Sequence, residues 1–150
     1  MRTLVVAVIF LAAVANVGFA QNTAEPGVEV VLSRENPLHL RVTLTSGAAN
    51  DIKLNPFELP WGNRNSMVLV ATKPNGEALE LAYPIDDPLN THITVKAGET
   101  LTGEIDLQDV IRDTNAVKKS DVLLFWAYKA PAALRLPRWI GGLVVIPQQK

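Results

Sequence analysis

The sequence predicts an all-β protein, an antiparallel β-sandwich with one short corner helix, from three observations. Apolar and polar residues alternate with a period of two along several short segments. Glycine, proline and asparagine separate these segments at short spacing, and no internal repeat is present. One segment, 106–119, places apolar residues at helical spacing. We expect about nine strands in a single domain, with a closed barrel as the alternative architecture.

The N-terminal segment has the order of residues that is typical of a cleavable secretory signal peptide. Arg2 and the free amine precede an apolar stretch, 4–15, and small residues lead up to Ala20. The apolar stretch is interrupted by polar residues and lacks a basic stop, which disfavours the alternative of an uncleaved membrane anchor. We therefore expect a signal peptide over 1–20 and one domain over 21–150.

Composition excludes several classes of protein. Cleavage removes Arg2 and leaves 13 basic against 15 acidic residues, a formal charge of −2, without the basic face that nucleic acid requires or the polybasic run that an anionic membrane attracts. The chain has no cysteine, which excludes disulfides, thiolate catalysis, cysteine-bound zinc and a lipid-modified N-terminal cysteine. The domain must therefore be stabilised by burial alone. An exported protein that has neither disulfides nor a lipid anchor fits a bacterial periplasm, so we expect a periplasmic or secreted protein.

The first strands follow from alternation and turn residues. A strand is expected over 28–34, before the break at Asn36-Pro37. The segment 38–45 alternates strictly between apolar and polar residues, which predicts one buried and one solvated face. A shorter alternation follows the next turn, over 52–55.

The strongest local signal predicts a β-hairpin. Two strand-like runs, 67–72 and 78–83, flank Asn75-Gly76, whose residues adopt positive φ at low cost. Pro74 suits the turn because its fixed φ cannot continue a strand ladder.

The second half of the chain predicts further strands over 93–95 and 101–107, separated by a turn. A helix is expected next, capped by Asp106 or Asp109, because four apolar residues roughly share one helical face. These residues are Leu107, Val110, Ile111 and Val117.

Two more strands complete the expected sandwich. The segment 122–128 is apolar on both faces, which predicts a central strand covered on both sides. A proline-punctuated connection over 130–137 then leads to the last strand, 140–146.

The region from 38 to 128 resembles the immunoglobulin-like sandwich domains of exported bacterial proteins and of secreted proteases that carry such accessory domains. The segments that carry the resemblance are 38–45 (LHLRVTLT), 52–56 (IKLNP), 97–107 (AGETLTGEIDL) and 121–128 (DVLLFWAY). Proteinase inhibitors with such sandwiches show a similar order of segments, so the resemblance implies an immunoglobulin-like fold and, as one function, proteinase inhibition. The paired cysteines of antibody domains and the three-loop signature of chagasin-like inhibitors are absent, so no inhibitory residue is carried over.

Candidate chemistry is sparse. His39 and His92 are expected in strands at polar positions, where a copper or zinc site would need neighbouring strands and a carboxylate. Asp86-Asp87 suits a solvated turn, with a calcium site as the alternative. Glu104 and Asp106 would share the outer face of a strand. No nucleophile motif or phosphate loop occurs, so we expect no enzyme, metal or cofactor.

Two loops, 56–65 and 129–142, are the candidate binding surfaces. Both combine tryptophan and arginine, the side chains that most often anchor protein interfaces, with prolines that restrict the backbone. The candidate residues are Trp61, Arg64, Arg135, Arg138 and Trp139. The alternative is structural: Phe57 and Trp61 would close the open end of the sandwich and Trp139 would cover a sheet edge, while Trp126 belongs to the core.

These observations favour a non-enzymatic module that binds another envelope or extracellular protein. A proteinase inhibitor of the same architecture is one alternative. A carbohydrate-binding module that uses Trp61 or Trp139 is the other, because an indole can stack on a sugar ring.

Overall fold

The protein is an antiparallel β-sandwich in a computed structural model that describes residues 24–62, 66–82 and 91–149. The predicted signal peptide and the Asp86-Asp87 turn lie outside these residues. One sheet has the order β1-β2-β6 and the other β4-β7-β8, and a two-stranded sheet pairs β3 with β5. The strands of the first sheet are β1 (Gly27–Leu32), β2 (His39–Thr45) and β6 (Thr100–Asp106). Those of the other two are β4 (Met67–Thr72), β7 (Val122–Lys129), β8 (Trp139–Ile146), β3 (Ile52–Leu54) and β5 (Ile93–Val95).

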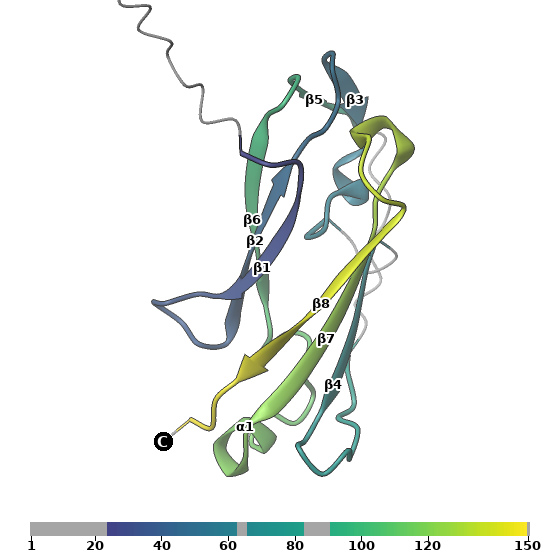
Figure 1. The fold of residues 1–150 in the computed structure, drawn as a ribbon. Helices are drawn as coiled ribbons and strands as arrows, with labels where there is room; N and C mark the ends of the chain where they lie inside the picture. The colour runs from purple at the N-terminus through teal and green to yellow at the C-terminus, as the bar shows by residue number, and fades with distance from the viewer. Residues whose placement is uncertain (1–23, 63–65, 83–90, 150) are drawn as a thin grey trace, which may run out of the picture.

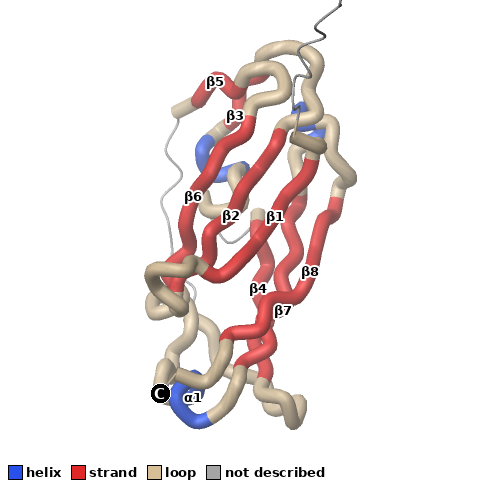
Figure 2. Tube along the Cα trace, turned by 60° about the vertical axis from the view of Figure 1, so that its left-hand side comes forward, coloured by secondary structure: helices blue, strands red, loops and turns tan. Residues whose placement is uncertain are grey.

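The two three-stranded sheets form separate layers, and the small β3-β5 sheet lies at one end (Figures 1 and 2). In immunoglobulin-like domains, strands A, B and E lie in one sheet and C, F and G in the other. The observed orders match that division when β1, β2 and β6 stand for A, B and E. The predicted all-β sandwich is therefore confirmed, including its short α-helix, α1 (Ala116–Lys119).

The core is built from the inward-facing residues of both sheets. Alternate residues of β2 and β7 are buried, as a period of two requires. Leu40 and Leu44 from β2 and Leu124 from β7 are fully buried in one apolar cluster. Trp126 belongs to the same cluster, which confirms its predicted place in the core. Each such side chain stabilises the fold by about 1.5–3 kcal/mol relative to an exposed one.

The predicted hairpin is only half formed. The turn is present, because the Lys73 N–H donates to the Glu77 carbonyl at 2.8 Å and Gly76 has a φ of 86°. The run after the turn is not a strand, however: beyond one bridge to β4, Leu81 pairs with Ile111 instead. Leu81 is thereby buried beside Ile111 in the core, which explains why the chain leaves β4.

The predicted helix over 106–119 is also shorter than expected. Only Ala116–Lys119 is α-helical, and the segment before it forms a turn. The four apolar residues that suggested the helix are all buried, so their spacing identified core positions correctly. The backbone around Ile111 bonds instead to the run after the hairpin turn, with the Arg112 N–H donating to the Glu80 carbonyl at 3.1 Å.

The strand β7 is central, as predicted, but only one of its faces is covered. Its inner residues are buried, whereas Phe125 on the outer face is 45% exposed. An apolar strand therefore need not be buried on both sides, and the outer face of this sheet is open in the described residues.

Tyr128 provides a direct test of how the segment around Glu58 is attached to the core. Its fully buried side chain donates a hydrogen bond from the hydroxyl to the Glu58 carbonyl at 2.7 Å. Tyr128→Phe deletes this donor and leaves the carbonyl without it, so the free energy of unfolding should fall by about 1–2 kcal/mol at neutral pH. Urea denaturation measures the change.

The same substitution has a pH signature. Burial, and then the Glu58 carboxylate, raise the pKa of Tyr128 above its ordinary value of 10.0. The unfolded chain therefore releases this proton first, and the wild-type protein loses stability as the pH rises above about 10. Tyr128→Phe lacks this loss, so the stability difference between the two proteins should shrink at high pH. A constant difference across that range would contradict the assignment.

Candidate protein-binding interface

The two candidate loops meet at one end of the sandwich. The connection from β2 to β4 contains β3 and a 3-10 helix, η1 (Pro56–Glu58). The connection from β7 to β8 contains another, η2 (Ala132–Leu134). Both lie at the upper end in Figure 1, and the Gly47 N–H donates to the Leu134 carbonyl at 2.9 Å. We call this surface the loop end. Trp61, Arg135, Arg138 and Trp139 all belong to it, whereas Arg64 lies outside the described residues.

The start of the loop end is held in place by a capping box. The Asn55 side chain accepts a hydrogen bond from the Phe57 N–H at 3.0 Å, and the Glu58 carboxylate accepts one from the Asn55 N–H at 2.9 Å. Pro56 occupies the first turn, where its fixed φ is favourable. Together with the bond from Tyr128, these contacts fix η1 against β7.

Trp61 closes the sandwich rather than standing free. Its indole is half-buried and packs against the core. Gly103 on β6 pairs with the fully buried Val42, so it occupies an inward-facing position. A methyl group added at Gly103 would overlap the indole ring, which therefore takes the space of a missing side chain. Phe57 does not share this role, because it lies outside the core cluster and lines a surface hollow.

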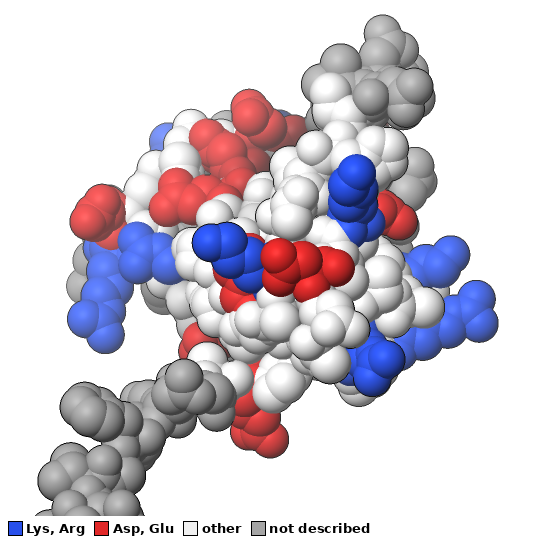
Figure 3. Space-filling view, turned by 90° about the horizontal axis from the view of Figure 1, so that it is seen from above, with Lys and Arg blue, Asp and Glu red and all other residues white. Residues whose placement is uncertain are grey.

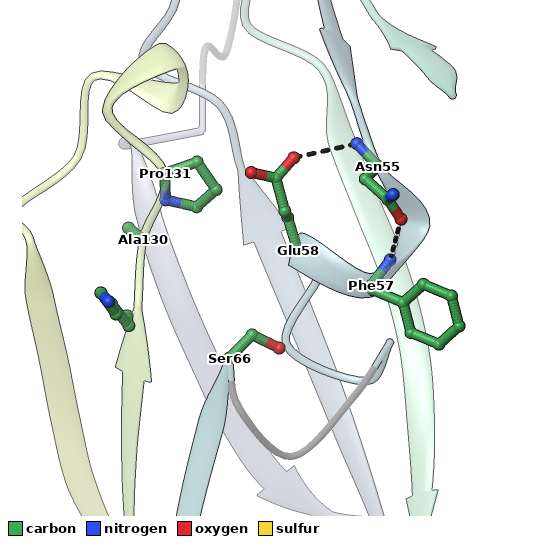
Figure 4. Close-up of a pocket in the computed structure, with 7 residues that line it drawn as sticks. Asn55, Phe57, Glu58, Ser66, Ala130 and Pro131 are labelled. Carbon is green, nitrogen blue, oxygen red and sulfur yellow. Dashed lines mark hydrogen bonds between the residues drawn. The ribbon is translucent and has the colours of Figure 1, made fainter. Parts of the chain in front are cut away.

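Two open hollows flank the segment that follows β7. One, of about 410 Å³, lies between this segment and η1 (Figure 4). Its lining residues are Asn55, Phe57, Glu58, Ser66, Lys129, Ala130 and Pro131. The other, of about 360 Å³, lies towards β8 and is lined by Lys129, Ala130, Pro131, Ala132, Leu136 and Arg138. Lys129, Ala130 and Pro131 form the wall common to both. They lie within the predicted loop 129–142 but were not among its candidate site residues.

Trp139 and its arginine neighbours are presented to solvent. Trp139 pairs with Lys129 at the start of β8 and is 53% exposed, so it is not buried as a cover. Arg135 and Arg138 are both exposed. Arg135 adopts a left-handed backbone with a φ of 53°, held because the preceding Leu134 is fully buried.

Charges of both signs occur at the loop end. Figure 3 looks onto it and shows basic and acidic side chains both at the edge and near the middle of the face, with uncharged surface between them. Within the described ranges, neither Arg135 nor Arg138 forms an ion pair with a carboxylate. The N–H groups of their guanidinium groups are therefore available to donate hydrogen bonds to other groups or to water.

The histidines do not form a metal site in the part of the chain that is described. His39 on β2 lies 3.3 Å from the Asp106 carboxylate and 3.7 Å from that of Glu104, which confirms that the two carboxylates share the outer face of β6. His92 is exposed and precedes β5, so the prediction that it lies within a strand was wrong. Across residues 24–62, 66–82 and 91–149, no three metal-binding side chains lie close enough to hold an ion.

Comparison with protein-family models finds no match, and none of the curated proteins matches the sequence. Among the described residues, no helix has the length and apolar character needed to cross a membrane.

The packing of Trp61 on Gly103 can be tested with a matched pair of strand glycines. Gly103→Ala forces the indole to move, so the free energy of unfolding should fall by about 1–3 kcal/mol and the tryptophan emission should shift to longer wavelength. Gly27→Ala on β1 is the control, because its added methyl group meets nothing within 4 Å and should change stability by less than about 0.5 kcal/mol. Equal effects of the two substitutions would show that Trp61 does not depend on this site.

Proposed function

We propose that this chain is an exported, non-enzymatic module that binds another envelope or extracellular protein through its loop end. The observation that carries the proposal is Trp139, which is 53% exposed beside the hollow that Arg138 lines. Tryptophan and arginine dominate the binding energy of protein interfaces, because they combine a large contact area with directed polar groups. The partner would cover Trp139 and fill that hollow.

The rigidity of the β7–β8 connection supports this proposal. Leu134 anchors it in the core, and the Ala130 N–H donates to the Arg138 carbonyl at 3.0 Å. A surface that is already ordered loses less conformational entropy on binding. Immunoglobulin-like variable domains also use the loops after strands B and F at one end for recognition, and the loop end is built from the equivalent connections.

The non-enzymatic part of the proposal rests on the environment of the carboxylates. General acid–base catalysis requires a titratable side chain that faces the substrate in a cleft sheltered from bulk water. Glu104 and Asp106 instead lie beside His39 on a solvated sheet face. No buried acid–base pair is therefore available for catalysis at this position.

A second candidate function is carbohydrate binding, which the exposure of Trp139 also favours. Its indole lies partly open to solvent, where it can stack on a sugar ring. Trp61, the other tryptophan considered for this role, packs on Gly103 instead. The carbohydrate hypothesis therefore rests on Trp139 alone.

Capture from envelope extract tests the protein-binding proposal. Trp139→Ala should raise the Kd for the captured protein about tenfold or more, and Arg138→Ala should raise it as well, because both remove contacts at the proposed centre. Arg34→Ala is the matched control, since Arg34 is exposed in the β1–β2 connection at the far end of β2. Isothermal calorimetry with the purified partner measures each Kd.

Three outcomes separate the candidate functions. A partner whose affinity is unchanged by Trp139→Ala places binding elsewhere on the molecule. Quenching of tryptophan fluorescence by a cell-wall glycan, lost in Trp139→Ala, favours carbohydrate binding. Inhibition of a secreted protease at micromolar concentration would instead support the inhibitor that the immunoglobulin-like resemblance implies.

Export is tested by the mature N-terminus. We expect the protein recovered from a periplasmic or culture-medium fraction to begin at Gln21, because the sequence up to Ala20 fits signal-peptidase cleavage. Intact-mass spectrometry identifies the first residue. Recovery of the full-length chain in the membrane fraction would contradict the signal-peptide assignment and favour an uncleaved anchor.

A further inference from the structure

The outer face of the β4-β7-β8 sheet is apolar and exposed. Three cross-strand rows run over it, and the middle row joins Val70, Phe125 and Leu143. Thr72 is the one polar residue of the three rows, and we call the other eight residues the apolar face: Val68, Val70, Leu123, Phe125, Ala127, Gly141, Leu143 and Val145. Its five large side chains that face solvent most fully are Val68, Val70, Phe125, Leu143 and Val145, each 44–50% exposed.

The opposite sheet shows that this is not a general property of the fold. On the outer face of β2 and β6, the corresponding positions carry polar or charged side chains, such as Arg41, Thr43 and Glu104. One sheet therefore has the usual solvated outer face, and the other has an outer face that resembles an inner one.

The amount of exposed apolar surface suits an interface. The apolar face leaves on the order of 400–500 Å² of apolar side chain open to solvent, towards the upper end of what a soluble monomer exposes in one patch. Two such faces packed together would bury about 800–1,000 Å² in total and their rims would add to this, whereas a specific protein–protein interface should exceed about 1,000 Å².

The charges at the ends of β7 indicate what covers this face. Asp121, which immediately precedes β7, and Lys129, its last residue, have the same strand phase as Phe125 and lie four residues to either side of it. Asp121 is exposed, and one of its carboxylate oxygens accepts a hydrogen bond from the Gln148 N–H at 2.8 Å. The apolar face between them carries no charged side chain. The pattern along the strand is therefore acidic, apolar, basic, with Phe125 at its midpoint.

We propose that a second copy of this chain covers the apolar face, with the two β7 strands antiparallel across the interface. A twofold axis that lies between the sheets at Phe125 and runs across the strands places Asp121 of each copy opposite Lys129 of the other. The parallel arrangement would instead place like charges opposite each other, which is unfavourable. Sheets pack in this way at about 10 Å separation and with strands within about 30° of one another.

This dimer and the proposed partner at the loop end use neighbouring surfaces. Trp139 has the same strand phase as Leu143 and pairs with Lys129, so it borders the apolar face in the row next to Gly141. In the antiparallel arrangement the two loop ends point in opposite directions, and the hollow that Arg138 lines belongs to the β7–β8 connection of each copy. Phe125→Glu tests the dimer and Trp139→Ala tests the partner, so the failure of one proposal can be distinguished from the failure of the other.

Sedimentation velocity on the purified protein from residue 21 onward, which contains every described residue, tests the dimer. We expect a mass twice that of one chain at about 100 µM, and a monomer for Phe125→Glu, because each copy would then bury a carboxylate at the centre of the interface. Val31→Glu is the matched control: Val31 is 42% exposed on the other sheet, so this variant should remain dimeric. Thermal melting followed by circular dichroism verifies that each variant is folded.

A charge swap tests the antiparallel orientation. Asp121→Lys or Lys129→Asp alone should raise the dimer Kd about tenfold, because like charges then face each other, and the double variant should restore the Kd to within about threefold of the wild type. A monomer at about 100 µM, a Phe125→Glu variant that still dimerises, or a double variant no better than the single ones would each overturn the proposal.

Discussion

The burial of the inner face of β7 is the constraint on which the rest of the structure depends. The chain has no cysteine, so no covalent link joins the two sheets. The sheets are joined by their shared apolar core, to which this central strand contributes Val122, Leu124, Trp126 and Tyr128. Their burial orients β4 and β8 on either side and determines where the β7–β8 connection begins. The Tyr128 hydroxyl also donates a hydrogen bond to η1, so the loop end is attached directly to the core.

The two sides of β7 have different roles: the inner side positions the loop end, and the outer side forms part of the apolar face. The inner side fixes the ends of β7 and β8, and thereby presents Trp139 and Arg138 beside a hollow. The outer side leaves Phe125 and its neighbours exposed. A rigid scaffold lets both surfaces be ordered before any contact is made, which lowers the entropic cost of association. One strand would then support two separate interactions, one with a different protein and one with a second copy.

Sequence patterns predicted the class of fold and most strands, because a period of two reports which residues share a face. They failed where the pairing partner mattered. The run after Gly76 has strand-like alternation, but its Leu81 pairs with Ile111 rather than continuing along β4. The same local pairing displaced most of the expected helix. Among the candidate site residues, tryptophan and arginine could be selected by type, but the closure of the sandwich by Trp61 depends on Gly103, which is distant in the sequence.

The sequence by itself determined that this chain forms an antiparallel sandwich stabilised without disulfides, because alternation and the absence of cysteine are local properties. Only the tertiary structure decided which apolar residues are covered. The segment 122–128 is apolar throughout, yet one side forms the core and the other is open, because the second sheet packs on one face alone. Tertiary structure also brought the two candidate loops to the same end, where it packed Trp61 against the core and left Trp139 exposed. The physical reason is that an apolar side chain gains free energy from burial, but it is buried only where another part of the folded chain packs against it.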